Sequence, residues 1–256
     1  KDGVINLDDV KQLLKHDKNV TTILKGDEQY RPGDFRSQEC IQLLKQADIV
    51  ATNPPFSLFR EYVEQLVDHN KKFVIIGSMN AITYKEIFPL IKDNKMWLGN
   101  GFNAGNAYFS TPNANQYGGG VYMPETGLVK FRNVNWFTNI DHGRRHQPLT
   151  LMTMSENLKF NKKLKGKTQY DKYDNYDAIE VPFTVAIPSD YSGVMGVPIS
   201  FLDKYNPDQF EIVGWSRHNA YNMDGGYWLG GKSDATIDGI EVYRRILIKH
   251  KKGSKS

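Results

Sequence analysis

The sequence predicts an α/β fold in which a doubly wound sheet precedes a β-rich C-terminal region. Two observations support this prediction. Helical and strand spacing alternates between residues 38 and 98, as in sheets that carry helices on both faces. From residue 141 onward helical periodicity is sparse, whereas Pro, Gly, Tyr and Asn are frequent. The 256 residues are enough for one large α/β domain, or for a core with a smaller second domain.

The first part of the chain shows three helical and three strand patterns. Apolar residues at helical spacing indicate the helices, and short buried runs indicate the strands. Ser37 can cap the first helix, and Pro54 and Pro55 end the first strand. In chain order we expect helix 38–47, strand 48–52, helix 57–68, strand 73–77, helix 81–93 and strand 95–98.

The pattern changes after about residue 100. Residues 101–127 are rich in Gly, Asn and Tyr, which indicates a long insertion or loop. Residues 128–140 are β-rich, and short strands are expected further along at 181–187, 210–215 and 240–249.

Composition excludes several classes of protein. No apolar run approaches the roughly 18–20 residues that span a bilayer, so no membrane association is expected. Cys40 is the single cysteine, which excludes an intrachain disulfide and a cysteine-based zinc site, and no metal site is predicted. No signal peptide is recognisable, so a reducing cytoplasm is the expected compartment. The net charge of +4 is compatible with a polyanionic partner without requiring one.

The most informative motif is Asn53-Pro54-Pro55-Phe56, directly after the strand 48–52. Two prolines fix φ and remove two N–H donors, so the turn is rigid and its carbonyls are free to accept hydrogen bonds. The Asn53 side-chain oxygen and the Pro54 carbonyl can together bind the two hydrogens of an sp² amine. Phe56 can stack on the base that carries this amine, once that base has been flipped out of a duplex. The alternative interpretation is an ordinary Pro-Pro turn at the end of a strand.

Two cationic segments follow the probable sheet. The run 141–146 places Arg144, Arg145 and His146 after an expected strand end, where an arginine can read guanine edges or bind phosphate. Residues 159–167 carry further lysines, and Lys162 and Lys163 are predicted to contact DNA phosphates. The alternative for both segments is a solvated charged surface.

On these residues the sequence resembles the EcoRI-type adenine-N6 DNA methyltransferases, over roughly residues 33–250. Asn53-Pro54-Pro55-Phe56 matches the motif of methyltransferases that act on exocyclic or amide amines. The resemblance implies a Rossmann-like class I methyltransferase sheet, S-adenosylmethionine as methyl donor and double-stranded DNA as partner. The matching segments are Gly33–Ser37, Asp48–Tyr62, Phe73–Asn94, Trp136–His146 and Gly193–Pro198 through Phe210–Gly214.

The resemblance also implies roles for particular residues. Asp34 would accept a hydrogen bond from the adenine amine of the donor, Phe35 would border that ring, and Asn53 would lie beside the donor as well as the substrate. Residues 1–140 would form the catalytic core, with an insertion near 101–127, and residues 141–256 the target-recognition region. Since residues 1–32 show no donor-binding loop, we expect the chain to lack the N-terminal part of the fold.

The predicted function is therefore site-specific adenine-N6 methylation of DNA, in a restriction–modification or phage context, by a monomer with a possible cognate restriction endonuclease. One alternative is an amino-methyltransferase acting on cytosine N4, RNA or a glutamine amide, because Phe56 suits all of these. Another is a degenerate methyltransferase that binds DNA without catalysis. Residues 2–9 resemble the second half of a calcium-binding loop, although a surface turn is the favoured interpretation.

Overall fold

The computed structural model describes residues 23–100, 106–118, 120–218 and 223–251. The chain divides into two compact units, residues 1–48 and 49–256, which are treated separately here. The possible calcium-binding segment 2–9 lies outside the described residues. No helix in the described ranges has the length and apolar character that crossing a membrane requires.

In the first unit, the described helix is α2 (Gln38–Gln46), which confirms the helix expected at 38–47. Its N-cap is Ser37, whose hydroxyl accepts a hydrogen bond from the Cys40 N–H at 3.2 Å. The Glu39 carboxylate accepts hydrogen bonds from the backbone N–H groups of Lys25 and Gly26 at 2.8 and 3.1 Å. The preceding segment is thereby fixed to the first turn of the helix.

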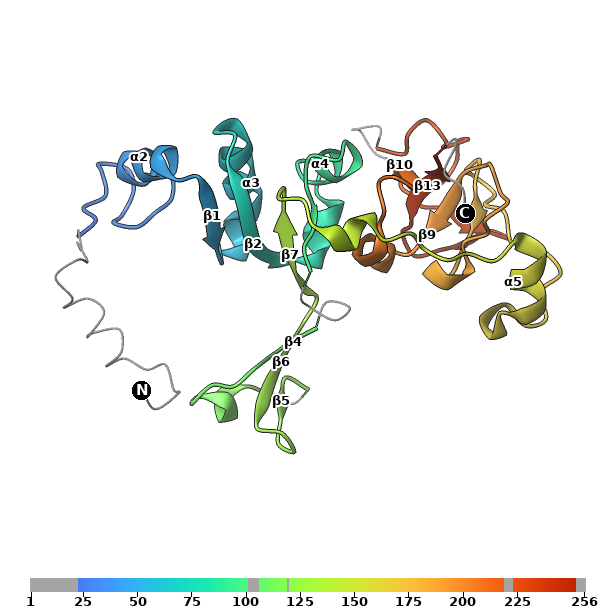
Figure 1. Cartoon of the computed structure of the whole chain (residues 1–256), viewed down its shortest axis with the longest axis horizontal. Helices are drawn as coiled ribbons and strands as arrows, with labels where there is room; N and C mark the ends of the chain where they lie inside the picture. The colour runs from blue at the N-terminus through green and yellow to red at the C-terminus, as the bar shows by residue number, and fades with distance from the viewer. Residues whose placement is uncertain (1–22, 101–105, 119, 219–222, 252–256) are drawn as a thin grey trace. The chain divides into compact units, whose positions relative to one another are not determined.

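The second unit begins with a four-stranded mixed sheet (Figure 1). Its strands occur in the order β1 (Ile49–Thr52), β2 (Lys72–Ser78), β7 (Val134–Thr138) and β3 (Trp97–Leu98). The β1–β2 pair is parallel, whereas β7 is antiparallel to both β2 and β3. The α/β class is thus confirmed, with strands at three of the predicted positions and a fourth inside the β-rich segment 128–140.

Helix α3 (Phe59–Asp68) connects the two parallel strands. Phe59, Val63 and Leu66 form its buried face, as the helical spacing predicts. The Phe59 ring packs over Gly77 of β2 and lies edge-on to the Phe137 ring of β7, with 5.1 Å between ring centroids. A Cβ on Gly77 would lie 2.4 Å from the Phe59 ring, so only glycine allows this approach.

Several predicted elements are shorter than expected or broken. The helix expected at 81–93 is divided into the 3-10 helix η2 (Met79–Thr83) and α4 (Phe88–Lys92), where Pro89 occupies the first turn that proline tolerates. The strand expected at 240–249 consists of β12 (Ile240–Glu241) and β13 (Ile246–His250). β10 (Phe210–Trp215) confirms the strand expected at 210–215.

The strand predicted at 181–187 is wrong. Pairing there stops after β8 (Ile179–Glu180), and the chain turns into η6 (Thr184–Ala186). Pro182 has no N–H to donate to a strand ladder, which explains why an otherwise apolar run does not continue as a strand.

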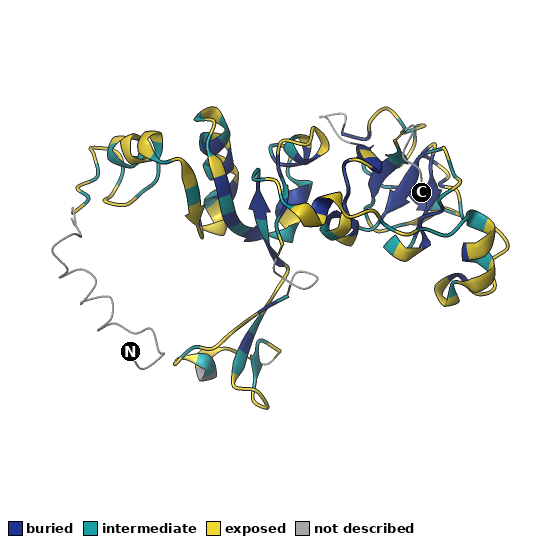
Figure 2. Cartoon of the chain, in the orientation of Figure 1, coloured by how far each residue is buried: buried dark blue, intermediate teal, exposed yellow. Residues whose placement is uncertain are grey.

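The insertion expected near 101–127 contains strands instead of an irregular loop. β4 (Asn106–Phe109) and β5 (Tyr122–Met123) pair with opposite edges of β6 (Leu128–Arg132), and the three strands form a small antiparallel sheet. The short helix η3 (Ala114–Gln116) lies between β4 and β5. Figure 2 shows that this sheet is largely exposed, in contrast to the buried centre of the β2–β7 sheet.

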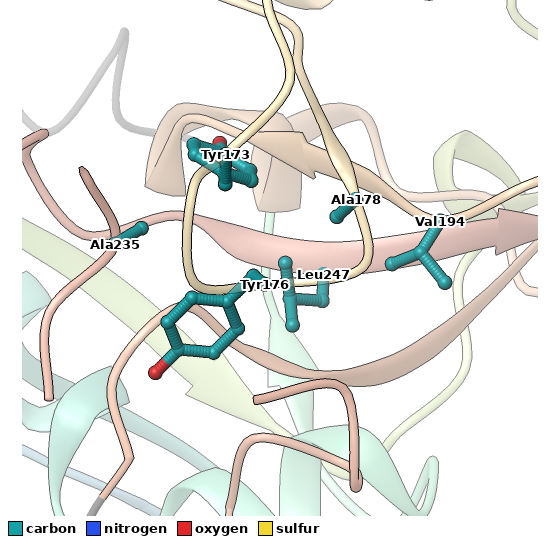
Figure 3. Close-up of a cluster of buried hydrophobic side chains, with 6 residues drawn as sticks. All are labelled: Tyr173, Tyr176, Ala178, Val194, Ala235 and Leu247. Carbon is teal, nitrogen blue, oxygen red and sulfur yellow. The ribbon is translucent and has the colours of Figure 1, made fainter. Parts of the chain in front are cut away.

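The C-terminal part forms a second four-stranded sheet in the order β10, β13, β9 (Met195–Val197) and β8. Tyr173, Tyr176 and Leu247 belong to the buried cluster beside this sheet (Figure 3). Phe88 of α4 stacks on Trp215 of β10 with ring centroids 5.6 Å apart, which joins α4 to the C-terminal sheet. The other elements here are η4 (Gly143–His146), α5 (Met154–Phe160), η5 (Lys162–Leu164), η7 (Ile199–Lys204) and β11 (Thr236–Ile237).

We predict that Gly77→Ala lowers the free energy of unfolding by about 1–3 kcal/mol, because the added methyl forces Phe59 or the strand to move. Urea denaturation followed by circular dichroism measures this change. The control is Gly118→Ala, where a Cβ meets no atom within 4 Å. Equal stability of the two variants would show that the Phe59–Gly77 packing does not constrain the fold.

Candidate active site

The Asn-Pro-Pro-Phe motif lies at the carboxyl end of β1, the position at which open α/β sheets bind ligands. β1 ends at Thr52, which pairs with Ile75 of β2. Asn53 and Phe56 are exposed and Pro54 is buried, so the turn presents one amide and one ring to solvent.

Hydrogen bonding in the turn separates the two proline carbonyls. The Pro55 carbonyl accepts a hydrogen bond from the Leu58 N–H at 3.0 Å, which forms the 3-10 helix η1 (Phe56–Leu58). Because the Pro55 carbonyl is used within this turn, Pro54 provides the carbonyl next to Asn53 that can bind an amine. Phe59, the first residue of α3, follows this helix and packs against Gly77 of β2. The turn is therefore fixed by β1 at one end and by Phe59 at the other.

An open cavity of about 480 Å³ adjoins the motif. Residues 53–56 form one side of it, and Ile76 and Val134 of the central strands contribute an apolar surface. Ile76 points to the face of β2 opposite Phe73, Ile75 and Gly77, which α3 covers, because successive side chains of a strand alternate. The cavity is also lined by two aromatic rings that sequence reasoning missed, Phe109 of β4 and Phe131 of β6.

The residues predicted to bind the methyl donor, Asp34 and Phe35, lie in the first unit. Arg36 donates to both Asp34 oxygens, at 3.0 Å from Nε and 2.8 Å from Nη2. These hydrogen bonds, followed by one from the Arg36 backbone N–H, lower the pKa of Asp34 to about 2. Asp34 is therefore a carboxylate that only accepts hydrogen bonds at neutral pH, and the half-buried Phe35 lies beside it.

The cationic turn 141–146 directs its two arginines differently. Arg145 is 7% exposed and its guanidinium lies 3.8 Å from the Trp97 ring centroid. It also donates to Asn94 and to Asp141, the latter at 3.1 Å. Arg144 is exposed and donates to the Asn100 side chain at 2.6 Å. The structure therefore brings Arg145 into the protein and leaves Arg144 at the surface.

His146 lies between two carboxylates. One ring nitrogen is 2.6 Å from Asp208 and the other is 2.9 Å from Asp141. The hydrogen bond to Asp208, and then that to Asp141, raises the pKa of His146 above its ordinary value. His146 and, to a lesser extent, Arg145 lower the pKa of Asp141 to about 2. The turn is thus closed by an ion network that links it to residues far along the chain.

The predicted lysines lie in η5 and are exposed. Lys163 Nζ is 4.1 Å from the Phe183 ring centroid. Sequence reasoning missed a second cationic surface, an open pocket lined by Arg60, Arg217 and Arg244. Asp234 lies between two of these arginines, 3.6 Å from Arg217 Nε and 3.7 Å from Arg244 Nε. These arginines are distant in sequence, so no local charge run indicates them.

An Asn-Pro-Pro-Phe motif at the carboxyl end of a parallel strand suits an amino-methyltransferase, and comparison with known proteins shows the family. The chain belongs to the EcoRI family of adenine-specific methyltransferases, whose family model matches residues 1–251. This finding confirms the resemblance and the enzyme class that the sequence predicts. No solved structure matches the chain.

Three relatives are Type II methyltransferases. The chain is 46% identical to M.EcoRI of Escherichia coli over 245 residues, which is 94% of this chain and 68% of that protein. It is 42% identical to M.MgeORF184P of Mycoplasma genitalium over 77% of this chain and 59% of that protein. Identity to M.MpnI of Mycoplasma pneumoniae is 35%, over 86% of this chain and 69% of that protein.

We predict that the His146 imidazole titrates above 6.5, its ordinary pKa, and that Asp208→Asn moves this pKa down. Because this pKa is higher in the folded than in the unfolded state, protonation of His146 stabilises the folded protein. The stabilisation is fully present at a pH below the unfolded pKa and is lost as the pH rises through the folded pKa. NMR titration of the imidazole measures both proteins. An identical titration in wild type and variant would exclude Asp208 as the principal cause of the shift.

Proposed function

We propose that this protein transfers a methyl group from S-adenosylmethionine to N6 of an adenine flipped out of a specific duplex DNA site. The observation that carries the proposal is the position of Asn53–Phe56, at the end of a parallel strand and on one side of an open aromatic cavity. Membership of an adenine-specific family favours adenine over cytosine N4, RNA or a glutamine amide. Type II relatives favour a restriction–modification context with a cognate endonuclease.

The residues of the motif divide the chemistry. The Asn53 side-chain oxygen and the Pro54 carbonyl accept the two hydrogens of the target amine and direct its lone pair out of the ring plane. Phe56 stacks on the purine. The described residues that line the cavity carry neutral side chains, and in this proposal the amine reacts through its own lone pair. The proton left on the methylated nitrogen passes to water at the open mouth of the cavity.

The methyl donor has chemically suitable residues. Asp34 is held ionised by Arg36, so it accepts a hydrogen bond from the adenine amine of the donor. Phe35 would border the adenine ring, and Asn53 would lie beside the methyl group. S-adenosylmethionine, when bound, supplies the electrophilic methyl.

The proposal extends to the architecture. The parallel β1–β2 pair with its α3 crossover supports a Rossmann-like methyltransferase sheet. In this interpretation residues 1–140 form the catalytic core and residues 141–256, with the separate β10–β13–β9–β8 sheet, form the target-recognition region.

DNA contact is proposed for exposed cations. Arg144, Lys162 and Lys163 remain candidates, and His146 contributes through the charge that its raised pKa favours. Arg145 is not retained as a base-reading residue, because its guanidinium is buried on Trp97. The arginines of the Arg60–Arg217–Arg244 pocket are additional candidates for phosphate.

We predict that Asn53→Ala lowers the methyl-transfer rate by about 10²–10³, the usual effect of losing one preorganised hydrogen-bonding partner at a reacting centre. DNA affinity should stay within a few-fold. Labelled-methyl transfer to plasmid DNA measures the rate and maps the modified site, and mass spectrometry identifies the base. Turnover close to wild type would remove Asn53 from the mechanism.

We predict that substitution of the two adjacent arginines affects different properties, DNA binding for Arg144 and stability for Arg145. Arg144→Ala should weaken DNA binding, either with relaxed specificity at one base or with a salt slope lower by about one unit. Arg145→Ala should chiefly lower the free energy of unfolding, since it removes a buried cation from Trp97 and Asp141. Binding titrations at several salt concentrations and thermal unfolding separate the two. Unchanged DNA affinity, specificity and salt slope in Arg144→Ala would leave this turn without a role in DNA binding.

A further inference from the structure

We propose that the small sheet β4–β6–β5 provides a second aromatic wall of the base pocket, in which Phe109 and Phe131 contact the extruded adenine together with Phe56. This inference rests on the proposed function and adds residues to the same site. Its starting point is the cavity lining, which combines the Asn53–Phe56 turn with these two rings of the insertion.

Strand register explains why both rings lie on one face. In the antiparallel β4–β6 pair Ala107 faces Phe131, and Phe109 faces Val129. Directly paired residues share a face of the sheet, so these four apolar side chains lie together. Tyr108 pairs with Lys130 on the other face, and Lys130 Nζ lies 5.5 Å from the Tyr108 ring centroid. The four apolar side chains therefore share the face opposite Tyr108 and Lys130.

The apolar face is buried at Ala107 and Val129 but exposed at the two rings. Ala107 and Val129 are 2% and 0% exposed, whereas Phe109 and Phe131 are 45% and 38% exposed. The two rings lie edge to face with centroids 5.8 Å apart, and the Tyr117 ring is 5.7 Å from Phe131. Phe56 on the other side of the cavity is 44% exposed. Three aromatic rings with free surface around one cavity need an apolar or π-stacking ligand to cover them.

The small sheet is joined directly to the sheet that holds the motif. Asn133 is the single residue between β6 and β7, and its φ of +61° is a left-handed conformation that Asn tolerates. Its carbonyl accepts from the Met79 N–H at 2.9 Å, and its side chain donates to Asn80 at 2.9 Å. Only Arg132 and Asn133 therefore separate Phe131 from β7, which pairs with β2.

A purine is the occupant that fits all of these groups. Its exocyclic amine matches the neutral acceptors Asn53 and Pro54, and its two π faces match aromatic rings on more than one side. Stacking on an aromatic side chain contributes about 1–3 kcal/mol per base, equivalent to roughly 5-fold to 150-fold in affinity. This contribution is made only after extrusion, so it should affect flipping and catalysis more than binding of the intact duplex.

The test uses Phe109→Ala and Phe131→Ala in the full-length protein, on the DNA site mapped with the wild type. We expect single-turnover methylation to fall by roughly 5-fold to 150-fold in each. We also expect a smaller fluorescence rise from 2-aminopurine at the target position, with duplex affinity within a few-fold. Tyr108→Ala is the matched control, because Tyr108 is the neighbour of Phe109 on the opposite face of the sheet; this variant should stay within about twofold of the wild type.

Two further variants keep the result interpretable. Phe131→Leu retains apolar volume without an aromatic face and should still lose rate, whereas Phe131→Tyr should retain it. If Phe109→Ala, Phe131→Ala and Phe131→Leu all behave as Tyr108→Ala does, the second wall is disproved. If the wild type transfers no methyl group to DNA adenine, the proposed function itself fails, and this outcome is distinct from a loss confined to the Phe109 and Phe131 variants.

Discussion

The packing of the Phe59 ring on the bare backbone of Gly77 is the contact on which the site depends. The Asn53–Phe56 turn has β1 on one side and α3 on the other, and neither element is long. Parallel pairing with β2 fixes the first end, and Phe59 seated between Gly77 and Phe137 fixes the second. A side chain at position 77 would lift α3 from the sheet and carry the turn with it. The geometry of the Asn53–Phe56 turn is therefore set by a glycine on a neighbouring strand.

The sequence predicts those parts of this arrangement that are encoded locally. The β1 strand, the Asn-Pro-Pro-Phe turn and the α3 face are contiguous, so strand, turn and helix patterns all point to the same structure. Predictions failed where one residue overrides an apolar pattern, as Pro182 does in the run 181–187. They also missed Phe109 and Phe131, because only strand register brings residues so far from position 53 to the same cavity.

The arginine pair shows a different limit of sequence reasoning. Arg144 and Arg145 are equivalent as charges, but in the turn η4 they point to different environments. The guanidinium of Arg145 lies on the Trp97 ring and donates to Asn94 and Asp141. Two of these partners are far from Arg145 in sequence and are brought to it by folding. A planar cation suits burial against an aromatic ring better than a lysine would. Charge density alone therefore cannot tell an exposed arginine from one that is buried and organises the turn.

The cavity is lined by two different structural elements, the Asn53–Phe56 turn and the inserted sheet. One side is a rigid turn with neutral acceptors, the groups proposed to bind the amine of a flipped base. The other side is an insertion whose rings are placed through Asn133 and the β6–β7 connection. Because β7 pairs with β2, and β2 with β1, the same sheet positions both sides of the cavity. Besides lining the cavity with its two rings, the insertion is thus connected to the Asn53–Phe56 turn through two strand pairings.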